Sequence, residues 1–235
     1  MDLVISPTLN EAENIDLLID SVSAEGGFEL LIVDDDSADG TAKLVENRSE
    51  TTPGLHLLHR VANPGFGKSY IDGFRRAIQL GAERVFTMDA DLSHPAEYLP
   101  QLRRALEEGA GVAIGSRYTP GGGIRNWPRR RLLISRAANY FARLVTRLPV
   151  RDCTAGFLGI RTELLKTIDL NALVCDGYGF LIELKHALWR AGASFAEVPI
   201  IFRDRTRGRT KFHSGMIREA ISTCFRLRRL GKAGV

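Results

Sequence analysis

The sequence has few cysteines and no long apolar run. Its 235 residues include three cysteines, Cys153, Cys175 and Cys224, which are far apart and form no Cys-x-x-Cys pair. This argues against a disulfide framework or a zinc site and fits a reducing cytosol. No stretch approaches the roughly 18 consecutive apolar residues of a membrane-spanning helix. The acidic start, MDLVISPTLNEAEN, predicts a first strand and not a signal peptide.

Acidic residues are missing from one long segment. Residues 125–151 hold eight arginines and no Asp or Glu, and residues 203–235 hold ten Lys or Arg against two acids. These segments together carry +16, and since the whole chain carries +4, the remainder sums to −12. Such a distribution indicates an anionic partner, such as phosphate groups or an anionic membrane surface, although a solvated basic face would give the same pattern.

The first half of the chain alternates between strand-like and helix-like patterns. Tyr70, Phe74 and Ala77, for example, recur at helical spacing. Repeated βα units predict the α/β class, a mostly parallel sheet flanked by helices, and no linker divides the single expected domain of residues 1–235. The expected strands are 3–6, 29–34, 55–59, 84–88 and 111–116.

After Ser116 the alternation stops, and we divide the chain into a first half of about 1–116 and a second half of about 117–235. A glycine-rich loop leads into a helix that places Leu133, Ala137, Phe141, Leu144 and Leu148 on one face, with arginines around it. The remaining expectations are a strand within 152–160, a helix over 178–191, a strand over 195–200, a basic loop over 202–212 and a basic amphipathic helix over 216–230.

Polar clusters follow three of the predicted strands. Ser6-Pro7-Thr8 follows the first, Asp34-Asp35-Asp36 the second, and Asp89-Ala90-Asp91 the fourth. Ligands of parallel α/β sheets bind beyond the carboxyl ends of the strands. Carboxylates at i and i+2 of an extended segment point the same way, so Asp89 and Asp91 can converge on one ligand.

Two interpretations of these motifs fail on spacing. A phosphoacceptor receiver domain would need a lysine roughly fifty residues after its acidic strand, yet none occurs between Lys68 and Lys166. The segment NPGFGKSYIDG suggests a phosphate-binding P-loop, but that pattern requires glycine where Ala62 stands. A turn that opens a helix is the simpler interpretation of Gly65 and Gly67.

A third interpretation explains more of the clusters together. Asp89 and Asp91 can hold Mg²⁺ or Mn²⁺, hard ions that prefer oxygen ligands and can bridge the diphosphate of a nucleotide sugar. Such an ion neutralises charge on the departing diphosphate. A lone D-x-D pair is a weak signal, so the interpretation depends on the motifs around it.

Those motifs run in register from Pro7 to beyond Lys211. They resemble the polyprenol-phosphate (dolichol-phosphate) mannose synthases, which are inverting glycosyltransferases of the GT-A fold. NWPRRRLLIS followed by RDCTAGF points to a prenyl-phosphate acceptor. The further motifs are PTLNEAENI, IVDDDSADGT, GFGKSYIDGF, MDADLSHP, GSRYTPGG, EVPIIF and RDRTRGRTKF.

The resemblance implies roles for particular residues. Arg117 and Arg131 would face the acceptor phosphate, and Arg205 and Lys211 would clamp the donor diphosphate. Asp91, Arg117 and Arg131 would be the catalytic residues. Ser93 stands where many members carry a glutamine that could be a third metal ligand. The donor would otherwise contact Pro7, Glu11, Val33, Asp34 in support, Asp35, Asp89 and Ala90.

The resemblance also implies the chemistry and the partners. GDP-mannose would be the donor and a polyprenyl monophosphate the acceptor; this phosphate is largely ionised at pH 7 and needs cations rather than a strong base. His94 is therefore expected at a helix start and not as a base. The protein would lie on the cytoplasmic face of a membrane, with its arginine-rich and last helices on anionic lipid, and would bind no nucleic acid. Two alternatives to this function remain: the same chemistry with another donor such as UDP-glucose, or a non-catalytic protein that binds a nucleotide sugar or a lipid phosphate.

Overall fold

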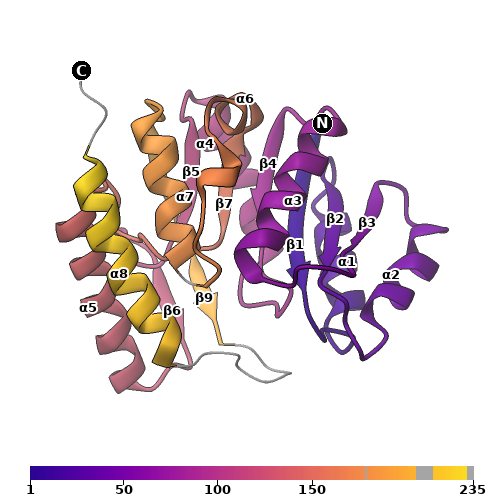
Figure 1. The fold of residues 1–235 in the computed structure, drawn as a ribbon. Coiled ribbons are helices and arrows are strands. Elements are labelled where there is room, and N and C mark those ends of the chain that lie inside the picture. The colour runs from indigo at the N-terminus through magenta and orange to yellow at the C-terminus, as the bar shows by residue number, and fades with distance from the viewer. Residues whose placement is uncertain (178, 205–213, 232–235) are drawn as a thin grey trace.

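A seven-stranded sheet runs through the molecule in the order β3-β2-β1-β4-β7-β5-β8 (Figure 1). This computed structural model describes residues 1–177, 179–204 and 214–231. The five strands predicted in the first half are all present, and β1, β2, β3 and β4 pair in parallel. Their bounds are β1 (Asp2–Thr8), β2 (Glu29–Asp34), β3 (Leu55–His59), β4 (Arg84–Thr87) and β5 (Val112–Ser116).

One strand from the second half enters the middle of the sheet. β7 (Leu158–Arg161) lies between β4 and β5 and runs antiparallel to both. β8 (Phe195–Pro199) then pairs in parallel with β5 at the sheet edge. The sheet is therefore mostly parallel, as predicted.

Helices cover both faces of this sheet. α1 (Ile15–Ala24), α2 (Thr41–Ser49) and α4 (Leu99–Glu107) share one apolar core with it. α3 (Phe66–Gln79), α6 (Thr162–Thr167) and α7 (Gly179–Arg190) share the other. Helix α1 begins later than the expected start near Glu11, because residues 11–14 form a turn. Short 3-10 turns, η1 (Ala96–Tyr98) and η2 (Leu170–Ala172), complete the two layers.

The two basic helices, α5 (Arg129–Thr146) and α8 (Ser214–Leu230), stand side by side at one end of the molecule (Figure 1). Core packing does not use the expected apolar face of α5, since Leu133 and Leu144 are 70% and 62% exposed. Leu148, beyond the helix end, is buried, and Phe141 is half-buried. The side chains that α5 buries are Asn139, Ala142, Val145 and Thr146.

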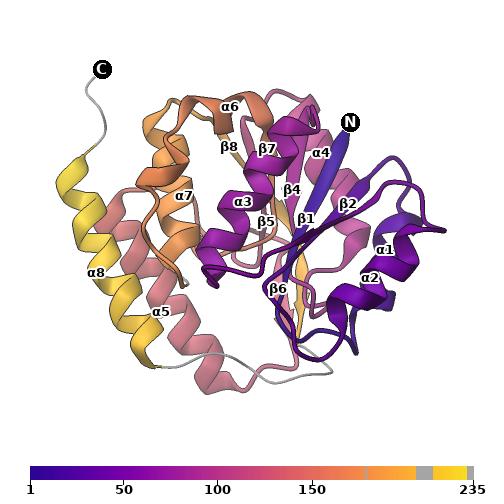
Figure 2. The ribbon, with the colours of Figure 1, turned by 45° about the vertical axis from the view of Figure 1, so that its right-hand side comes forward.

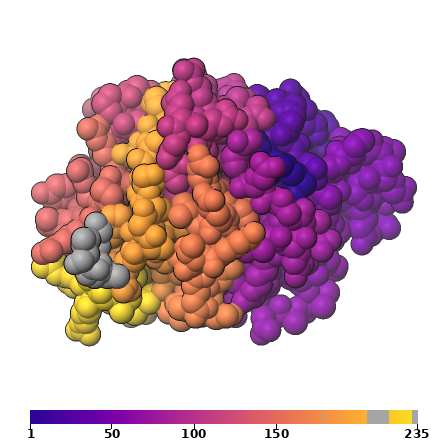
Figure 3. Space-filling model, turned by 90° about the horizontal axis from the view of Figure 1, so that it is seen from above, coloured from indigo at the N-terminus to yellow at the C-terminus, as the bar shows by residue number. Residues whose placement is uncertain are grey.

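A short two-stranded ribbon lies at the end of the sheet to which β1 and β4 point. It consists of β6 (Gly123–Arg125) and β9 (Ile201–Arg203), paired in parallel, at the lower end of the molecule in Figures 1 and 2. Seen from above, the N-terminal elements take the right-hand side and the C-terminal ones the left (Figure 3). The ribbon therefore brings the second half to the carboxyl ends of the first-half strands.

Candidate active site

The turn after β4 carries the two aspartates of the D-x-D motif. Asp91 is 8% exposed, and its Oδ1 accepts a hydrogen bond from the Ser93 amide at 3.1 Å. Leu92, between Asp91 and Ser93, adopts a φ of 63°, in the left-handed region that a leucine rarely enters. The side chain of Asp89 is 37% exposed. The turn thus holds one carboxylate firmly and leaves the other more open to a ligand.

His94 supports this turn from the protein side. Its Nδ1 accepts a hydrogen bond from the Asp89 amide at 3.0 Å, so this nitrogen carries no proton. The ring stacks on Phe157 with centroids 5.1 Å apart and meets the edge of Phe202 at 5.5 Å. A buried ring in this arrangement positions Asp89 and is not free to act as a base. The expectation that His94 is not the catalytic base stays a prediction.

The residues present fit a divalent cation that shares its ligands with a substrate. No group of three His, Cys, Asp or Glu side chains that could hold a metal occurs in the part of the chain that the structure describes. Mg²⁺ is commonly bound by one or two carboxylates together with substrate phosphates and water, and needs no complete protein cage. Asp89 and Asp91 match that pattern of hard oxygen ligands.

A second carboxylate pair follows β2, and its two members have different surroundings. Asp34 is fully buried and accepts hydrogen bonds from Thr8 Oγ1 at 2.8 Å and from the hydroxyl of Ser37 at 2.6 Å. Asp35 forms an ion pair with the buried Arg60 and accepts a hydrogen bond from the Gly65 amide at 2.7 Å. Asp34 is thus bound within the protein, and its supporting role stays a prediction, whereas Asp35 is held by Arg60, a residue without an assigned role in the sequence motifs.

The other predicted donor contacts lie close to these carboxylates along the sheet edge. β1 continues to Thr8, so Ser6, Pro7 and Thr8 end the strand and do not follow it as expected. Pro7 is partly exposed there, and Glu11 is partly exposed after the strand, where its amide donates to Thr41 Oγ1 at 3.0 Å. Ala90 is 4% exposed, and Val33 is fully buried in the core shared with α3. Val33 therefore offers packing to the site and no side-chain surface.

Arg117, which follows β5, is bound by a carboxylate that sequence motifs alone did not identify. Its Nε and Nη2 each lie 2.7 Å from the Asp152 carboxylate, and Nη2 also donates to Thr154 Oγ1 at 2.8 Å. Burial acts to lower the pKa of Arg117, but Asp152 outweighs it and holds the pKa above its usual value. In turn, burial acts to raise the pKa of Asp152 and Arg117 holds it below its usual value.

This ion pair changes the expected role of Arg117 in part. The forked face of the guanidinium binds Asp152 and is not presented to an acceptor, because Asp152 is fully buried behind it. Nη1 carries two further donors that the bonds to Asp152 and Thr154 do not use. The RDCTAGF motif contained the signal, an aspartate two residues before Thr154, but spacing could not connect it to Arg117.

Arg131 sits at the start of α5 and is exposed. Its guanidinium lies 3.8 Å from the centroid of the Trp127 ring, and Nη1 donates to Asp204 Oδ1 at 2.9 Å. Trp127 in turn meets the edge of Phe202, with centroids 5.5 Å apart. Since Phe202 also contacts His94, the chain of rings connects Arg131 to the D-x-D turn.

A groove of about 570 Å³ extends from Arg117 along α5. The lining holds four arginines and no acidic residue, and Arg136 and Arg143 lie two turns apart on one side of the helix. Within the described residues, the guanidinium groups of Arg136, Arg143 and Arg151 form no ion pair. The full lining is Arg117, Tyr118, Thr119, Gly122, Arg136, Asn139, Tyr140, Arg143 and Arg151.

The predicted roles of Ser93 and of the pair Arg205 and Lys211 are not tested by the structure. Ser93 is 2% exposed, and its hydroxyl has no hydrogen-bond partner in the described parts of the chain. Arg205 and Lys211, the expected clamp on the donor diphosphate, lie outside the described residues. Both therefore stay predictions.

Tyr70 is a buried group beside the D-x-D turn that the sequence motifs did not mark as functional. It lies on α3 and is fully buried, with its ring stacked on Phe180 of α7 at a centroid distance of 5.6 Å. Burial raises its pKa well above the usual value, and the carboxylates of Asp89 and Asp91 raise it further. A neutral phenol thus stands behind the two aspartates.

Comparison with known proteins supports one assignment of these features. The model of "Glycosyl transferase family 2" matches residues 3–169. A polyprenol monophosphomannose synthase of Mycolicibacterium smegmatis is 43% identical over 93% of this chain and 83% of its own length. An undecaprenyl-phosphate mannosyltransferase of Micrococcus luteus is 39% identical over 93% of this chain and 90% of its own.

Solved structures share the fold at lower identity. Glucosyl-3-phosphoglycerate synthase from Mycobacterium tuberculosis, in complex with Mn²⁺, UDP and glucosyl-3-phosphoglycerate, aligns with a TM-score of 0.72 at 22% identity, over all of this chain and 82% of that one. The mannosyltransferase PcManGT from Pyrobaculum calidifontis, in complex with GDP-Man and Mn²⁺, aligns at 0.59 and 16% identity, over 100% and 76%. The chain belongs to glycosyl transferase family 2, with the GT-A fold, in its polyprenol-phosphate mannose synthase branch.

Proposed function

We propose that the protein transfers mannose from GDP-mannose to the phosphate of a polyprenyl monophosphate, with inversion at the sugar carbon. The observation that carries the proposal is the meeting of two opposite charge environments at one end of the sheet. Carboxylates follow β1, β2 and β4, and the arginine-lined groove starts at Arg117. A diphosphate with its cation and a second phosphate require such neighbouring sites.

The donor would bind at the carboxylates. Arg60 and Gly65 hold Asp35, which would contact the nucleoside, and His94 holds Asp89, which would contact the diphosphate. A Mg²⁺ or Mn²⁺ ion held by Asp89 and Asp91, when bound, would neutralise the diphosphate as it departs. We propose Arg205 and Lys211 as further contacts of that diphosphate.

The acceptor would bind at the arginines. A phosphate monoester is already largely ionised at pH 7 and can attack the sugar carbon without a strong base. The Nη1 donors of Arg117, which its bonds to Asp152 and Thr154 do not use, would orient the attacking oxygen together with Arg131 and offset repulsion between two anions. His94 is buried, and its Nδ1 already accepts from the Asp89 amide, which supports a reaction that needs no base at that position. Positioning and electrostatics then supply most of the rate.

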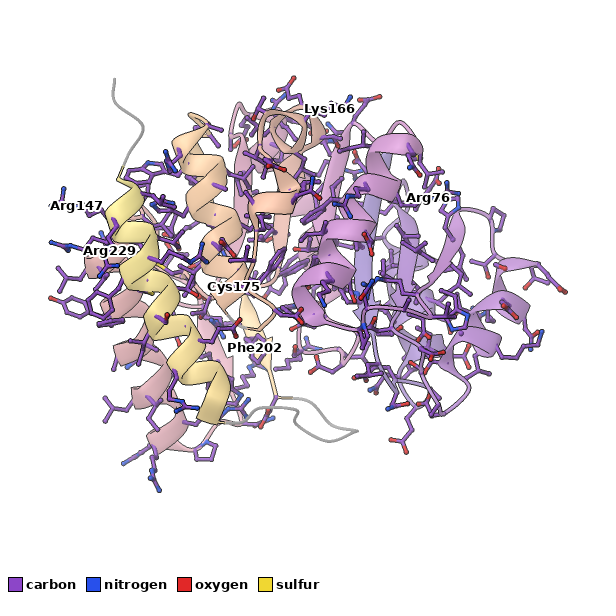
Figure 4. All side chains as sticks on the ribbon, viewed as in Figure 1. Arg76, Arg147, Lys166, Cys175, Phe202 and Arg229 are labelled. Carbon is purple, nitrogen blue, oxygen red and sulfur yellow. The ribbon has the colours of Figure 1, made fainter. Side chains whose placement is uncertain are left out.

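We also propose that the α5–α8 surface lies against the membrane that holds the prenyl chain. We define this surface by the exposed apolar residues of the two helices. Phe141 of α5 meets the edge of Phe225 of α8 at 5.9 Å, which joins their apolar residues. Arg147 and Arg229 point outward at the same end (Figure 4). The surface consists of Leu133, Ile134, Tyr140, Leu144, Ile221, Phe225 and Leu230.

An exposed apolar stripe beside arginines that form no ion pair with the described residues suits a helix lying in the lipid headgroup region. No helix in the described parts of the chain is long and apolar enough to cross a membrane. Contact through the α5–α8 surface would instead bring the acceptor's phosphate to the groove while its chain stays in the bilayer. We place the protein on the cytoplasmic face, where anionic lipids concentrate.

The direct test is a donor panel. The protein is incubated with Mg²⁺ or Mn²⁺, a prenyl phosphate and, in separate reactions, GDP-mannose, UDP-glucose and other nucleotide sugars. We expect a lipid-linked mannose from GDP-mannose alone. A product from UDP-glucose would overturn the donor, and the absence of any lipid-linked sugar would favour a non-catalytic binding protein.

A further inference from the structure

The glycine-rich turn before α3 binds carboxylates of this protein, one from each half of the chain. The amide of Gly67 donates to Asp176 Oδ1 at 3.0 Å, and the amide of Gly65 donates to Asp35 Oδ2 at 2.7 Å. These are first-turn amides, which have no partner within a helix and favour anions. The turn therefore acts as the meeting point of Asp35 in the donor site with Asp176, which lies in the second half.

Only glycine permits this approach. A Cβ atom at Gly67 would lie 2.3 Å from the carbonyl oxygen of Cys175, and one at Gly65 would lie 2.3 Å from Asp176 Oδ2. Both distances are far below any van der Waals contact. The two glycines that suggested a P-loop are thus explained by close packing against residues 175 and 176.

The segment that carries Asp176 is anchored at both sides. The amides of Asp176 and Gly177 donate to Glu219 Oε1 of α8 at 2.9 and 3.3 Å. The amide of Cys175 donates to Glu183 Oε2 of α7 at 2.9 Å. Because Glu183 also forms an ion pair with Arg226 of α8 at 2.7 Å, α7 and α8 hold the segment together.

On the other side, the start of α3 binds Asp35, one of the carboxylates proposed to hold the donor. Gly65 binds Asp35 directly, and Tyr70, one turn further on, lies beside Asp89 and Asp91. Phe180 of α7 stacks on Tyr70, so the second half touches this helix at two points. A shift of the first turn of α3 would therefore move Asp35, on which donor binding is proposed to depend.

We propose that Asp176 is a positioning residue for the donor site: its carboxylate caps α3 from the second half and fixes the first turn that orients Asp35. Glu219 contributes by holding the amides of residues 176 and 177. The proposal rests on the proposed function for the location of the donor. It predicts that affinity for the donor depends on residues that never touch it.

The test compares Asp176→Ala and Asp176→Asn with wild type by titration calorimetry with GDP and Mn²⁺, and by steady-state kinetics with both substrates. We expect Asp176→Ala to raise the Kd for GDP and the KM for the donor about tenfold, as for one lost charge-assisted hydrogen bond. The kcat and the KM for prenyl phosphate should change less than about twofold. Asp176→Asn keeps a neutral acceptor and should lie between, and Glu219→Gln should weaken GDP binding in the same direction.

Asp169→Ala is the matched control. Asp169 is also an exposed aspartate that caps a turn, accepting from the Asn171 amide at 2.9 Å, but it contacts neither Gly67 nor Glu219. Equal effects of Asp169→Ala and Asp176→Ala would show general loosening of the fold and overturn the proposal. So would a folded Asp176→Ala protein with wild-type GDP affinity, or a parallel rise of both KM values.

Two further outcomes are distinguishable. Should Asp176→Ala fail to fold, Asp176→Asn and Glu219→Gln provide the comparison, and wild-type GDP affinity in both would overturn the proposal. Wild-type protein that does not bind GDP would contradict the proposed donor and not the role of Asp176. The same variants are then compared with the nucleoside diphosphate that the donor panel identifies.

Discussion

The two halves of the chain treat their charged side chains in opposite ways. In the first half, Asp34 and Asp35 are buried and bound by neighbours within the protein. In the second half, Arg136 and Arg143 face a groove and form no ion pair within the described residues. The proposed donor side is thus organised in advance, whereas the proposed acceptor side keeps positive charge available for a partner from outside. Pre-organisation of this kind favours a small, fixed ligand, and open charge suits a membrane surface.

The largest effect should come from the D-x-D turn. Asp91→Asn removes a carboxylate from the proposed cation site with almost no change in shape, so we expect kcat to fall about 10³-fold. The melting temperature should stay near that of wild type. Asp16→Asn, at an exposed ion pair on α1, serves as the control and should leave the rate unchanged. An unaltered kcat for Asp91→Asn would contradict the proposal that the Asp91 carboxylate binds a catalytic cation.

Arg117 links the two halves of the comparison, because it is an arginine held by a buried carboxylate. Arg117→Lys keeps the charge but loses the fork that matches Asp152. We expect kcat/KM for prenyl phosphate to fall about 10²-fold, with a smaller change in donor affinity. The matched change is Arg104→Lys, at the exposed pair with Glu108. Equal activity of the Arg117→Lys enzyme would show that the guanidinium only stabilises the fold.

The α5–α8 surface predicts a membrane effect confined to the second half. The double substitution Leu133→Ser and Leu144→Ser should weaken binding to vesicles with anionic lipid about 10- to 100-fold, since each leucine would lose its burial in lipid. Leu17→Ser on α1, also exposed, is the control. Flotation with and without anionic lipid, at low and high salt, measures the effect. Salt-indifferent solubility of wild type would contradict membrane contact.

The smallest effect is one of pH on stability. The pKa of Asp152 lies below its usual value in the folded state, so its ionised form stabilises the fold above about pH 4, the unfolded pKa. This contribution is lost as the pH falls through the folded pKa. Urea unfolding of wild type and Asp152→Asn between about pH 5 and 2 should show the stability gap narrowing in acid. If the difference in free energy of unfolding between wild type and Asp152→Asn stayed constant with pH, the Arg117–Asp152 ion pair could not be its cause.

Much of the fold was predictable from periodicity. The runs at 29–34 and 55–59 match β2 and β3 residue for residue, because buried parallel strands are short apolar runs bounded by polar turns. The position of β7 in the middle of the sheet was not predictable. Antiparallel insertion is a long-range pairing, and local sequence does not encode it. The single domain and its division near residue 116 stay predictions.

The residues of the candidate site also differ in whether local sequence could identify them. Residues adjacent to strand ends, such as Asp34 and Asp89, could be found from sequence because topology brings strand ends together. Partners from distant segments could not: Asp152 binds Arg117 across 35 positions, and Asp176 reaches Gly67 across 109. The exposure of Leu133 was also hidden, because a helical pattern shows that a face is apolar and not what covers it.

The central claim is that donor binding is centred on the carboxylates after β4. Crystals soaked with Mn²⁺ and GDP-mannose test it most directly, because manganese can be located by its anomalous scattering. We predict one strong peak between Asp89 and Asp91, with the diphosphate beside it and the nucleoside near Asp35. A manganese ion or nucleotide bound elsewhere, with both aspartates unchanged, would contradict the account.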